Sequence, residues 1–161
     1  MTLEEAQEFA TLDKVRKRLE ERGIREPVKP KHEPKPISKN LMDEGGDSLV
    51  EQYREYEAFY EYVSYQHAVA TLKVGEWKNN LTALLSKAKK EVEKDEIDTL
   101  PVILEARKTL QIHEQEETLL GVHKSALHRR MQMLSRSVEI MKMSYDGSRR
   151  AGNAGLGGYG G

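Results

Sequence analysis

The sequence predicts an all-α protein whose main feature is a long antiparallel helical hairpin of the coiled-coil type. Apolar residues between Leu49 and Ala88 alternate at spacings of four and three. This is the 3.5-residue repeat of a helix that packs along its length against another helix. The stretch from Ile103 to Tyr145 keeps the same alternation. Only a short charged connection separates the two stretches, and long helices joined by a short connection run antiparallel.

Each predicted stripe contains polar residues, which either mark helix register and oligomer order or line a polar channel. The first stripe consists of Leu49, Tyr53, Tyr56, Tyr60, Val63, His67, Ala70, Val74, Trp77, Leu81, Leu84 and Ala88. The second consists of Ile103, Ala106, Leu110, His113, Glu117, Leu120, Lys124, Leu127, Met131, Leu134, Val138, Met141 and Tyr145.

The composition is typical of long solvated helices. Charged residues make up 33% of the chain, apolar residues 37% and aromatic residues 6%. The chain has no Cys, which excludes disulfides and thiolate chemistry and is typical of a cytosolic protein. No apolar run approaches the roughly 18 residues of a membrane helix, and the N-terminus is acidic. We therefore expect no membrane contact and a cytoplasmic location, which is the host cytoplasm if the protein is viral.

Residues 1–24 form a predicted N-terminal helical segment, either as one helix or as two short helices with a turn near residues 11–13. Thr2 is a candidate N-cap with Glu5 three residues later, and Val15 and Leu19 belong to the apolar face. Gly23 fits a C-cap after a basic last turn.

Residues 25–46 are predicted to be a basic, extended linker. Four prolines alternate with lysines in this stretch, and such a sequence cannot be helical. The prolines are Pro27, Pro30, Pro34 and Pro36.

Residues 47–146 form the predicted hairpin, and residues 147–161 are predicted to be a disordered Gly-rich tail. The first helix extends to about Lys94 and contains Gly75, which predicts close backbone packing or a kink. The caps expected at the helix starts are Asp47 or Ser48 for the first helix and Asp98 or Thr99, followed by Pro101, for the second. Folding about residues 96–97 places Trp77 near Glu116 and Glu117, and His67 near Ala126 and Leu127.

Further apolar rows lie beside both stripes and would stay exposed in a lone hairpin. Exposed apolar surface on this scale marks interfaces, so we predict self-association as a ring or bundle. The residues assigned to this oligomerisation surface are Phe59, Tyr62, Val69, Leu72, Leu85, Ile112, Leu119, Met133 and Ile140.

Two clusters have a structural and a functional interpretation. Tyr53, Tyr56 and Tyr60 occupy stripe positions, which favours packing over base stacking, whereas Tyr62 and Tyr65 are less constrained. The run from residue 113 to 117 lacks the second His of a helical zinc motif, which favours a solvated helix face over a metal site. The sequence also lacks a phosphate-binding loop and the local signature of a nucleophilic triad. We expect a protein that is not an enzyme and needs no cofactor or metal.

The best functional signal is the basic stretch from Lys14 to Lys39, which holds ten Lys and Arg residues against four Glu. Phosphate contacts by such cations supply most non-specific affinity for nucleic acids, and a helix followed by a basic arm can position a protein on DNA. An ordinary solvated helix face is the alternative. The DNA-binding residues assigned here are Lys14, Arg16, Lys17, Arg18, Arg22, Arg25, Lys29 and Lys31.

The run from Thr2-Leu3-Glu4-Glu5-Ala6 through Val15-Arg16 to Arg22-Gly23-Ile24 resembles a shortened helix-turn-helix of the excisionase type. The order of parts resembles the small subunits of bacteriophage terminases, in which a DNA-binding N-terminal region precedes a ring-forming helical hairpin and a variable tail. Residues 47–62 and 100–122 are similar to one branch of that family. The resemblance implies viral genome packaging, with double-stranded DNA, further copies of the chain and the large terminase subunit as partners.

A second resemblance concerns the C-terminal part of the hairpin. The segment Arg136-Ser137-Val138-Glu139-Ile140, with Lys142 and Gly147 beyond it, resembles the C-terminal helix of phage mediators that load a recombinase onto single-stranded DNA. Three functions are therefore weighed: a DNA-recognition protein of the small-terminase kind, a single-strand-binding recombination mediator, and a scaffold or virion protein without a nucleic-acid role.

Overall fold

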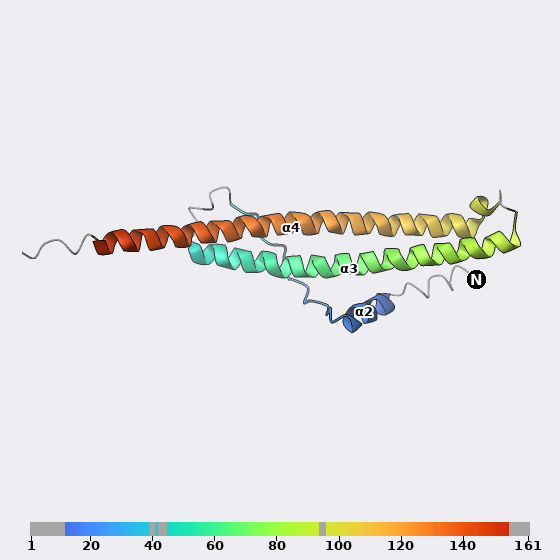
Figure 1. Ribbon diagram of the computed structural model, residues 1–161, viewed down its shortest axis with the longest axis horizontal. Helices are drawn as coiled ribbons and strands as arrows, with labels where there is room; N and C mark the ends of the chain where they lie inside the picture. The colour runs from blue at the N-terminus through green and yellow to red at the C-terminus, as the bar shows by residue number, and fades with distance from the viewer. Residues whose placement is uncertain (1–11, 39–40, 42–44, 94–95, 155–161) are drawn as a thin grey trace, which may run out of the picture. The chain divides into compact units, whose positions relative to one another are not determined.

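The described part of the chain is helical, as the sequence predicts. The computed structural model describes residues 12–38, 41, 45–93 and 96–154. Its regular elements are α2 (Leu12–Glu21), α3 (Gly46–Glu91), a 3-10 turn (Ile97–Thr99) and α4 (Pro101–Ala154). The helices α3 and α4 pack against each other in opposite directions (Figure 1). The predicted all-α class and helical hairpin are therefore confirmed.

The chain divides into two compact units, one of residues 1–29 and 61–124 and the other of residues 30–60 and 125–161. In the first unit, Trp77 and Leu84 of α3 form a core with Ile103 and Ala106 of α4. In the second unit, the core positions include buried side chains from both helices. These are Leu49, Tyr56, Leu127 and Leu134. The buried residues named for both cores are positions of the predicted stripes, so the 3.5-residue pattern identified the packed faces of the two helices.

The helix α2 ends where the sequence predicts. Gly23 has a φ of 77°, a left-handed conformation that glycine adopts without a steric penalty. The Ile24 N–H donates to the Leu19 carbonyl at 2.9 Å, and the Gly23 N–H donates to the Glu20 carbonyl at 2.8 Å. This pair of hydrogen bonds is the Schellman motif. The predictions for residues 1–11, including the Thr2 cap, concern a segment outside the described residues.

The predicted caps of the two long helices are wrong by one to three residues. The Gly45 carbonyl accepts the Leu49 N–H at 3.2 Å, so α3 begins at Gly46 rather than after Asp47 or Ser48. The Leu100 carbonyl accepts the Leu104 N–H at 3.0 Å, so Leu100 rather than Asp98 or Thr99 precedes α4. Thr99 instead donates to the Glu96 carbonyl within the 3-10 turn. Pro101 is the first residue of α4, as expected.

The predicted pairing of the hairpin is wrong by about one helical turn. Trp77 stacks on His113, with ring centroids 6.1 Å apart, rather than lying beside Glu116 and Glu117. His67 lies against Gly121 instead of Ala126 and Leu127. The connection contains a 3-10 turn, whose rise per residue differs from that of an α-helix, so a symmetric fold about residues 96–97 was the wrong assumption.

Two further expectations fail in part. A Cβ atom added to Gly75 would have no neighbour within 4 Å, so close packing, one of the two interpretations of this glycine, is wrong. The helix α4 continues through Ala154, so the predicted disorder from Gly147 is wrong for residues 147–154. Extending an existing helix costs far less than nucleating one, which lets α4 pass Gly147 and Gly152. Residues 155–161 lie outside the described residues.

The linker is free of helix, as predicted, over residues 25–38, whereas Leu41 has 3-10 conformation and Gly46 is the first residue of α3. Residues 24–38 have no helix or strand, as expected for a proline-rich stretch. In the second unit, the Tyr56 hydroxyl donates to the Lys35 carbonyl at 2.9 Å. This bond satisfies the buried phenol of a tyrosine that the sequence placed at a packed position.

Candidate nucleic-acid interface

The basic helix α2 packs against α3 in the first unit. Val15 and Leu19 are buried and form a core cluster with Tyr65 and Val69, beside which Leu72 packs. Residues four apart lie on one face of a helix, so Val15 and Leu19 point the same way. The sequence placed both on an apolar face but did not identify α3 as the surface that covers them.

Two of the predicted DNA-binding arginines form ion pairs within the chain. The Arg16 Nη2 atom lies 3.2 Å from Oε1 of Glu26. The Arg18 Nη1 atom lies 2.5 Å from Oε1 of Glu76, whose side chain is only 8% exposed. Both Glu76 carboxylate oxygens are buried without a partner in hydrogen-bonding geometry, so Arg18 neutralises this charge through proximity. Glu26 and Glu76 were not singled out from the sequence, since neither belongs to a recognisable motif.

The other cations assigned to DNA binding are exposed to solvent. They are Lys14, Lys17, Arg22, Arg25, Lys29 and Lys31. Lys17 and Arg22 belong to α2 and its C-terminal turn, whereas Arg25 and Lys29 follow in the extended linker. Arg16 is half-buried and Arg18 is tied to Glu76, so the surface available to a polyanion differs from the predicted set by these two residues.

Tyr65 lies beneath α2 and is 5% exposed, so its placement among the less constrained tyrosines was wrong. Burial raises the pKa of its phenol above the ordinary value of 10.0, and the negative charge of Glu26 raises it further. The Arg16 guanidinium opposes this rise. A buried, neutral phenol is not available for stacking on nucleic-acid bases while α2 stays in place.

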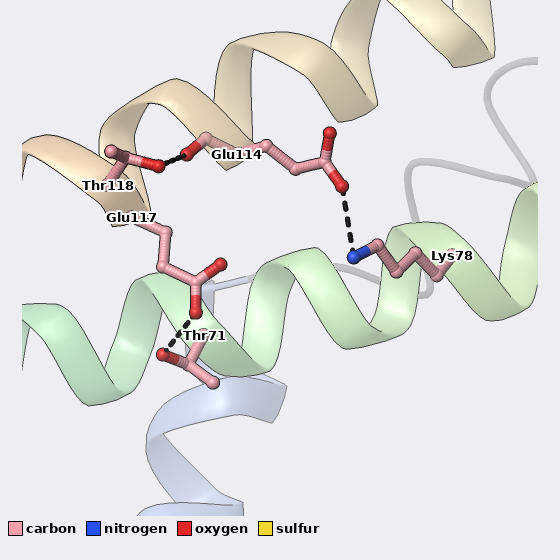
Figure 2. Close-up of polar contacts among 5 residues, drawn as sticks. All are labelled: Thr71, Lys78, Glu114, Glu117 and Thr118. Atoms are coloured by element: carbon pink, nitrogen blue, oxygen red, sulfur yellow. Dashed lines mark hydrogen bonds and ion pairs between the residues drawn. The ribbon is translucent and has the colours of Figure 1, made fainter. Parts of the chain in front are cut away.

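Polar contacts also join α3 and α4 in the first unit (Figure 2). Thr71 Oγ1 donates to Glu117 Oε1 at 2.8 Å, and Lys78 Nζ lies 3.0 Å from Glu114 Oε1. The Thr118 hydroxyl donates to the Glu114 carbonyl within α4. Glu117 is the polar stripe residue among these, and its partner lies across the hairpin. Its bond fits the structural interpretation, in which the polar residues of a stripe mark the register of the helices.

His113 was considered as a metal ligand. Its Nδ1 atom lies 3.5 Å from Glu116 Oε2, and its ring stacks on Trp77. Among the described residues, no group of three or more His, Asp or Glu side chains could hold a metal ion. The residues of this run therefore act in packing and in the pairing of the two long helices.

The predicted oligomerisation residues fall into two sets. On α3, Val69 and Leu72 pack against α2, and Leu85 packs against the Trp77 cluster, so the expectation that these side chains stay exposed is wrong. Phe59 and Tyr62 are half-buried. On α4, the row remains open to solvent. Its members are Ile112, Leu119, Met133 and Ile140.

Comparison with protein-family models, with curated proteins and with solved structures finds no match for this chain. Within the described residues, none of the helices has a stretch long and apolar enough to cross a bilayer.

Proposed function

We propose that this chain is a non-enzymatic, self-associating DNA-recognition protein of the kind represented by the small subunits of phage terminases. The observation that carries the proposal is the exposed basic surface of α2 and the start of the linker in the first unit, formed by Lys17, Arg22, Arg25 and Lys29. A helix that presents several cations together with an extended basic arm can contact successive phosphates. Many copies in one assembly add avidity, because each further contact becomes intramolecular.

The docked arrangement of α2 supports this proposal by holding the cations in place. Val15 and Leu19 face α3, so Lys17 and the end of α2 are directed away from the buried cluster. A short helix fixed on a long one presents charges with less loss of conformational freedom on binding than a free chain does.

The test is the salt dependence of binding to double-stranded DNA. Replacing Lys17, Arg22 and Arg25 with Gln is expected to weaken binding and to reduce the slope of log K against log salt by about 0.9 for each lost phosphate contact. The matched control replaces three exposed lysines elsewhere with Gln. These are Lys89, Lys90 and Lys108. Equal slopes for the wild type and the first variant would contradict the proposal.

A scaffold role without nucleic acid is the second candidate, and the packing of α2 favours it. Arg16 and Arg18 neutralise acidic residues of the same chain, so part of the basic surface already has a structural use. This candidate predicts no DNA binding even at low salt. A single-strand-binding mediator would instead bind single-stranded DNA more tightly than duplex DNA in the same titration.

A further inference from the structure

The basic surface of the first unit carries side chains that bind phosphate and few that read bases. Between Leu12 and Lys29 the chain has seven Lys and Arg residues and four acidic residues, and the rest are aliphatic residues, one Gly and one Pro. This stretch contains no Asn, Gln, Ser, Thr, His or aromatic residue. In duplex DNA, Asn and Gln identify adenine and Arg identifies guanine by paired hydrogen bonds to base edges. The arginines therefore decide whether this surface can read a sequence.

Both arginines within α2 are already paired with carboxylates of the chain. Arg16 lies 3.2 Å from Glu26, and Arg18 pairs with the buried Glu76. A guanidinium held by a carboxylate is not placed to form the two parallel bonds that identify guanine. Lys17, an exposed cation of the same helix, ends in a compact ammonium group that acts as a point charge. The helix therefore offers charge without the planar donor pair that recognises a base.

The other arginines of the surface lie beyond the helix. The last residue of α2 is Glu21, and the exposed Arg22 and Arg25 follow in a turn and in extended chain. Base edges in the major groove are read by side chains on an element that enters the groove, such as a helix or a two-stranded ribbon. Arg22 and Arg25 are instead placed like the cations that contact phosphates.

The side of α2 that a groove would meet also carries acidic residues. Val15 and Leu19 face α3, so the opposite side of the helix is the one open to a ligand. Asp13, Glu20 and Glu21 are exposed and lie around that opposite side. A carboxylate inside a groove is repelled by the phosphates of both strands. Contact with the outside of a duplex through the cations avoids this repulsion.

Exposed aromatic side chains, which single-stranded DNA requires, are missing from the described part of the first unit. Tyr65 and Trp77 are each 5% exposed, and Tyr62 is half-buried. Proteins that bind single strands stack successive bases on exposed aromatic rings. Duplex DNA has the denser charge, with one phosphate per ~1.7 Å of its axis. A surface of cations without aromatic rings therefore favours the duplex.

We propose that this basic surface binds the phosphate backbone of duplex DNA without reading its sequence. Lys17, Arg22, Arg25 and Lys29 supply the contacts, and none of them identifies a base. The inference rests on the DNA binding proposed above and specifies its mode. A contact of this kind has a dissociation constant of roughly 10⁻⁴–10⁻⁶ M for each chain at physiological salt. Any choice of one sequence over another then falls to other parts of an assembly.

Selection from a library of random duplexes tests the absence of sequence readout. The full chain is used to capture duplexes of equal length over several rounds, and the recovered pool is compared with the starting pool by fluorescence anisotropy. We expect the two pools to bind within about threefold of each other, whereas sequence-specific proteins favour their sites by ~10³–10⁷. A recovered motif that binds at least about tenfold tighter would overturn the proposal. Enrichment of A-tracts would overturn it too, because it would place an arginine in a narrow minor groove.

The salt dependence tests the preference for duplex DNA. Four phosphate contacts predict a slope of log K against log salt of about −3.6 for each bound chain on a duplex, at ~0.9 per contact. A single strand of the same length should bind more weakly, with a slope nearer −2.8 at ~0.7 per contact. Tighter binding of the single strand would overturn the proposal and would favour a recombination mediator.

Two sets of variants separate charge from base contacts. Arg22→Lys with Arg25→Lys keeps the charge and removes the planar donors, so it should change the affinity for every duplex by the same factor. Glu20→Gln with Glu21→Gln should tighten binding to every duplex by one common factor, since it removes two carboxylates from the exposed side of α2. The matched control is Glu93→Gln with Glu105→Gln, two exposed residues elsewhere in the first unit. A change in affinity that depends on the duplex sequence would overturn the proposal.

The outcomes also separate this inference from the function on which it rests. No binding to any DNA at low salt would contradict the proposed function itself. Binding to duplex DNA with one preferred sequence would leave that function standing and would overturn only the absence of sequence readout.

Discussion

The substitution Leu19→Ala should release α2 from α3 while leaving the hairpin folded. The helix α2 has ten residues, fewer than the ~12–15 that an isolated helix needs in water. It therefore depends on burial against α3, where Leu19 is 2% exposed and Val15 is fully buried. Leu-to-Ala substitutions in cores cost about 2–5 kcal/mol. A helix covered on one side belongs near the lower end, at about 2–3 kcal/mol.

This loss of free energy corresponds to a roughly 30- to 140-fold increase in the undocked population. Amide hydrogen exchange measures the change directly, because the local opening of one element raises exchange there and not elsewhere. We expect faster exchange across residues 15–21 and unchanged exchange in the part of α3 around Trp77. Leu12→Ala is the matched control, since Leu12 belongs to the same helix and is 41% exposed.

Two results would refute this reasoning. If exchange in α2 and around Trp77 rose together, α2 and the hairpin would unfold as one cooperative element. If exchange in α2 stayed at the wild-type rate, Leu19 would not be the residue that holds the helix.

Three further predictions concern stability. Gly75→Ala should raise the free energy of unfolding by about 0.5–1 kcal/mol in urea titrations, since a Cβ at this site meets no neighbour. Gly121→Ala should raise the free energy of unfolding by less, because its Cβ would lie 3.2 Å from the His67 ring. Arg18→Met should lower the free energy of unfolding by about 1–3 kcal/mol, because it leaves the Glu76 carboxylate buried and unpaired. Adding Glu76→Gln should recover part of that loss. A double variant no more stable than Arg18→Met would contradict the role of this ion pair. Tyr65 has a raised pKa when folded, so its stabilising contribution is complete below pH 10 and is lost as the pH rises through the folded value. Tyr65→Phe should therefore reduce the fall of stability above pH 10, measured as the shift in melting temperature, and an unchanged fall would argue against burial of the phenol.

Periodicity predicted the hairpin because it records which faces are packed. Nearly every position of both stripes is buried or half-buried, with Tyr145 the exception at 77% exposed. The register between the helices was not predictable in the same way. Apolar side chains such as Val74 and Leu84 pack almost equally well after a shift of one turn, so they fix the face and leave the pairing open.

Polar partners restrict the register, but a sequence does not show which of them meet. The Thr71 hydroxyl and the Glu117 carboxylate form a hydrogen bond in the observed pairing, and a shift of one turn would break it and leave the hydroxyl with the His67 carbonyl of its own helix. Many Glu and Thr residues lie at plausible positions, and the geometry of the connecting turn decides among them.

The sequence identified the basic stretch but not which of its cations can reach a ligand. A count of charges treats every Lys and Arg as equally exposed, because it does not show which of them form ion pairs within the chain. The pair of Arg16 with Glu26 joins α2 to the linker across ten positions, and the pair of Arg18 with Glu76 joins α2 to α3 across 58 positions, so neither pair follows from a count of charges. Val69 and Leu72, which the sequence assigned to an interface between copies, instead pack against α2 of the same chain.

The docking of α2 also divides the basic surface into two classes with different energetics. Moving Arg18 from Glu76 to a phosphate would leave a carboxylate buried without its counter-charge, which opposes the gain from the new contact. Lys17 and Arg22 carry no such penalty, because both are exposed while α2 remains docked. A polyanion that binds the docked protein should therefore use Lys17, Arg22 and the linker cations. Replacing the Glu76 contact of Arg18 by a phosphate contact is therefore opposed while α2 stays on α3. If the chain binds DNA as proposed, Leu19→Ala should lower this opposition and let Arg18 take part.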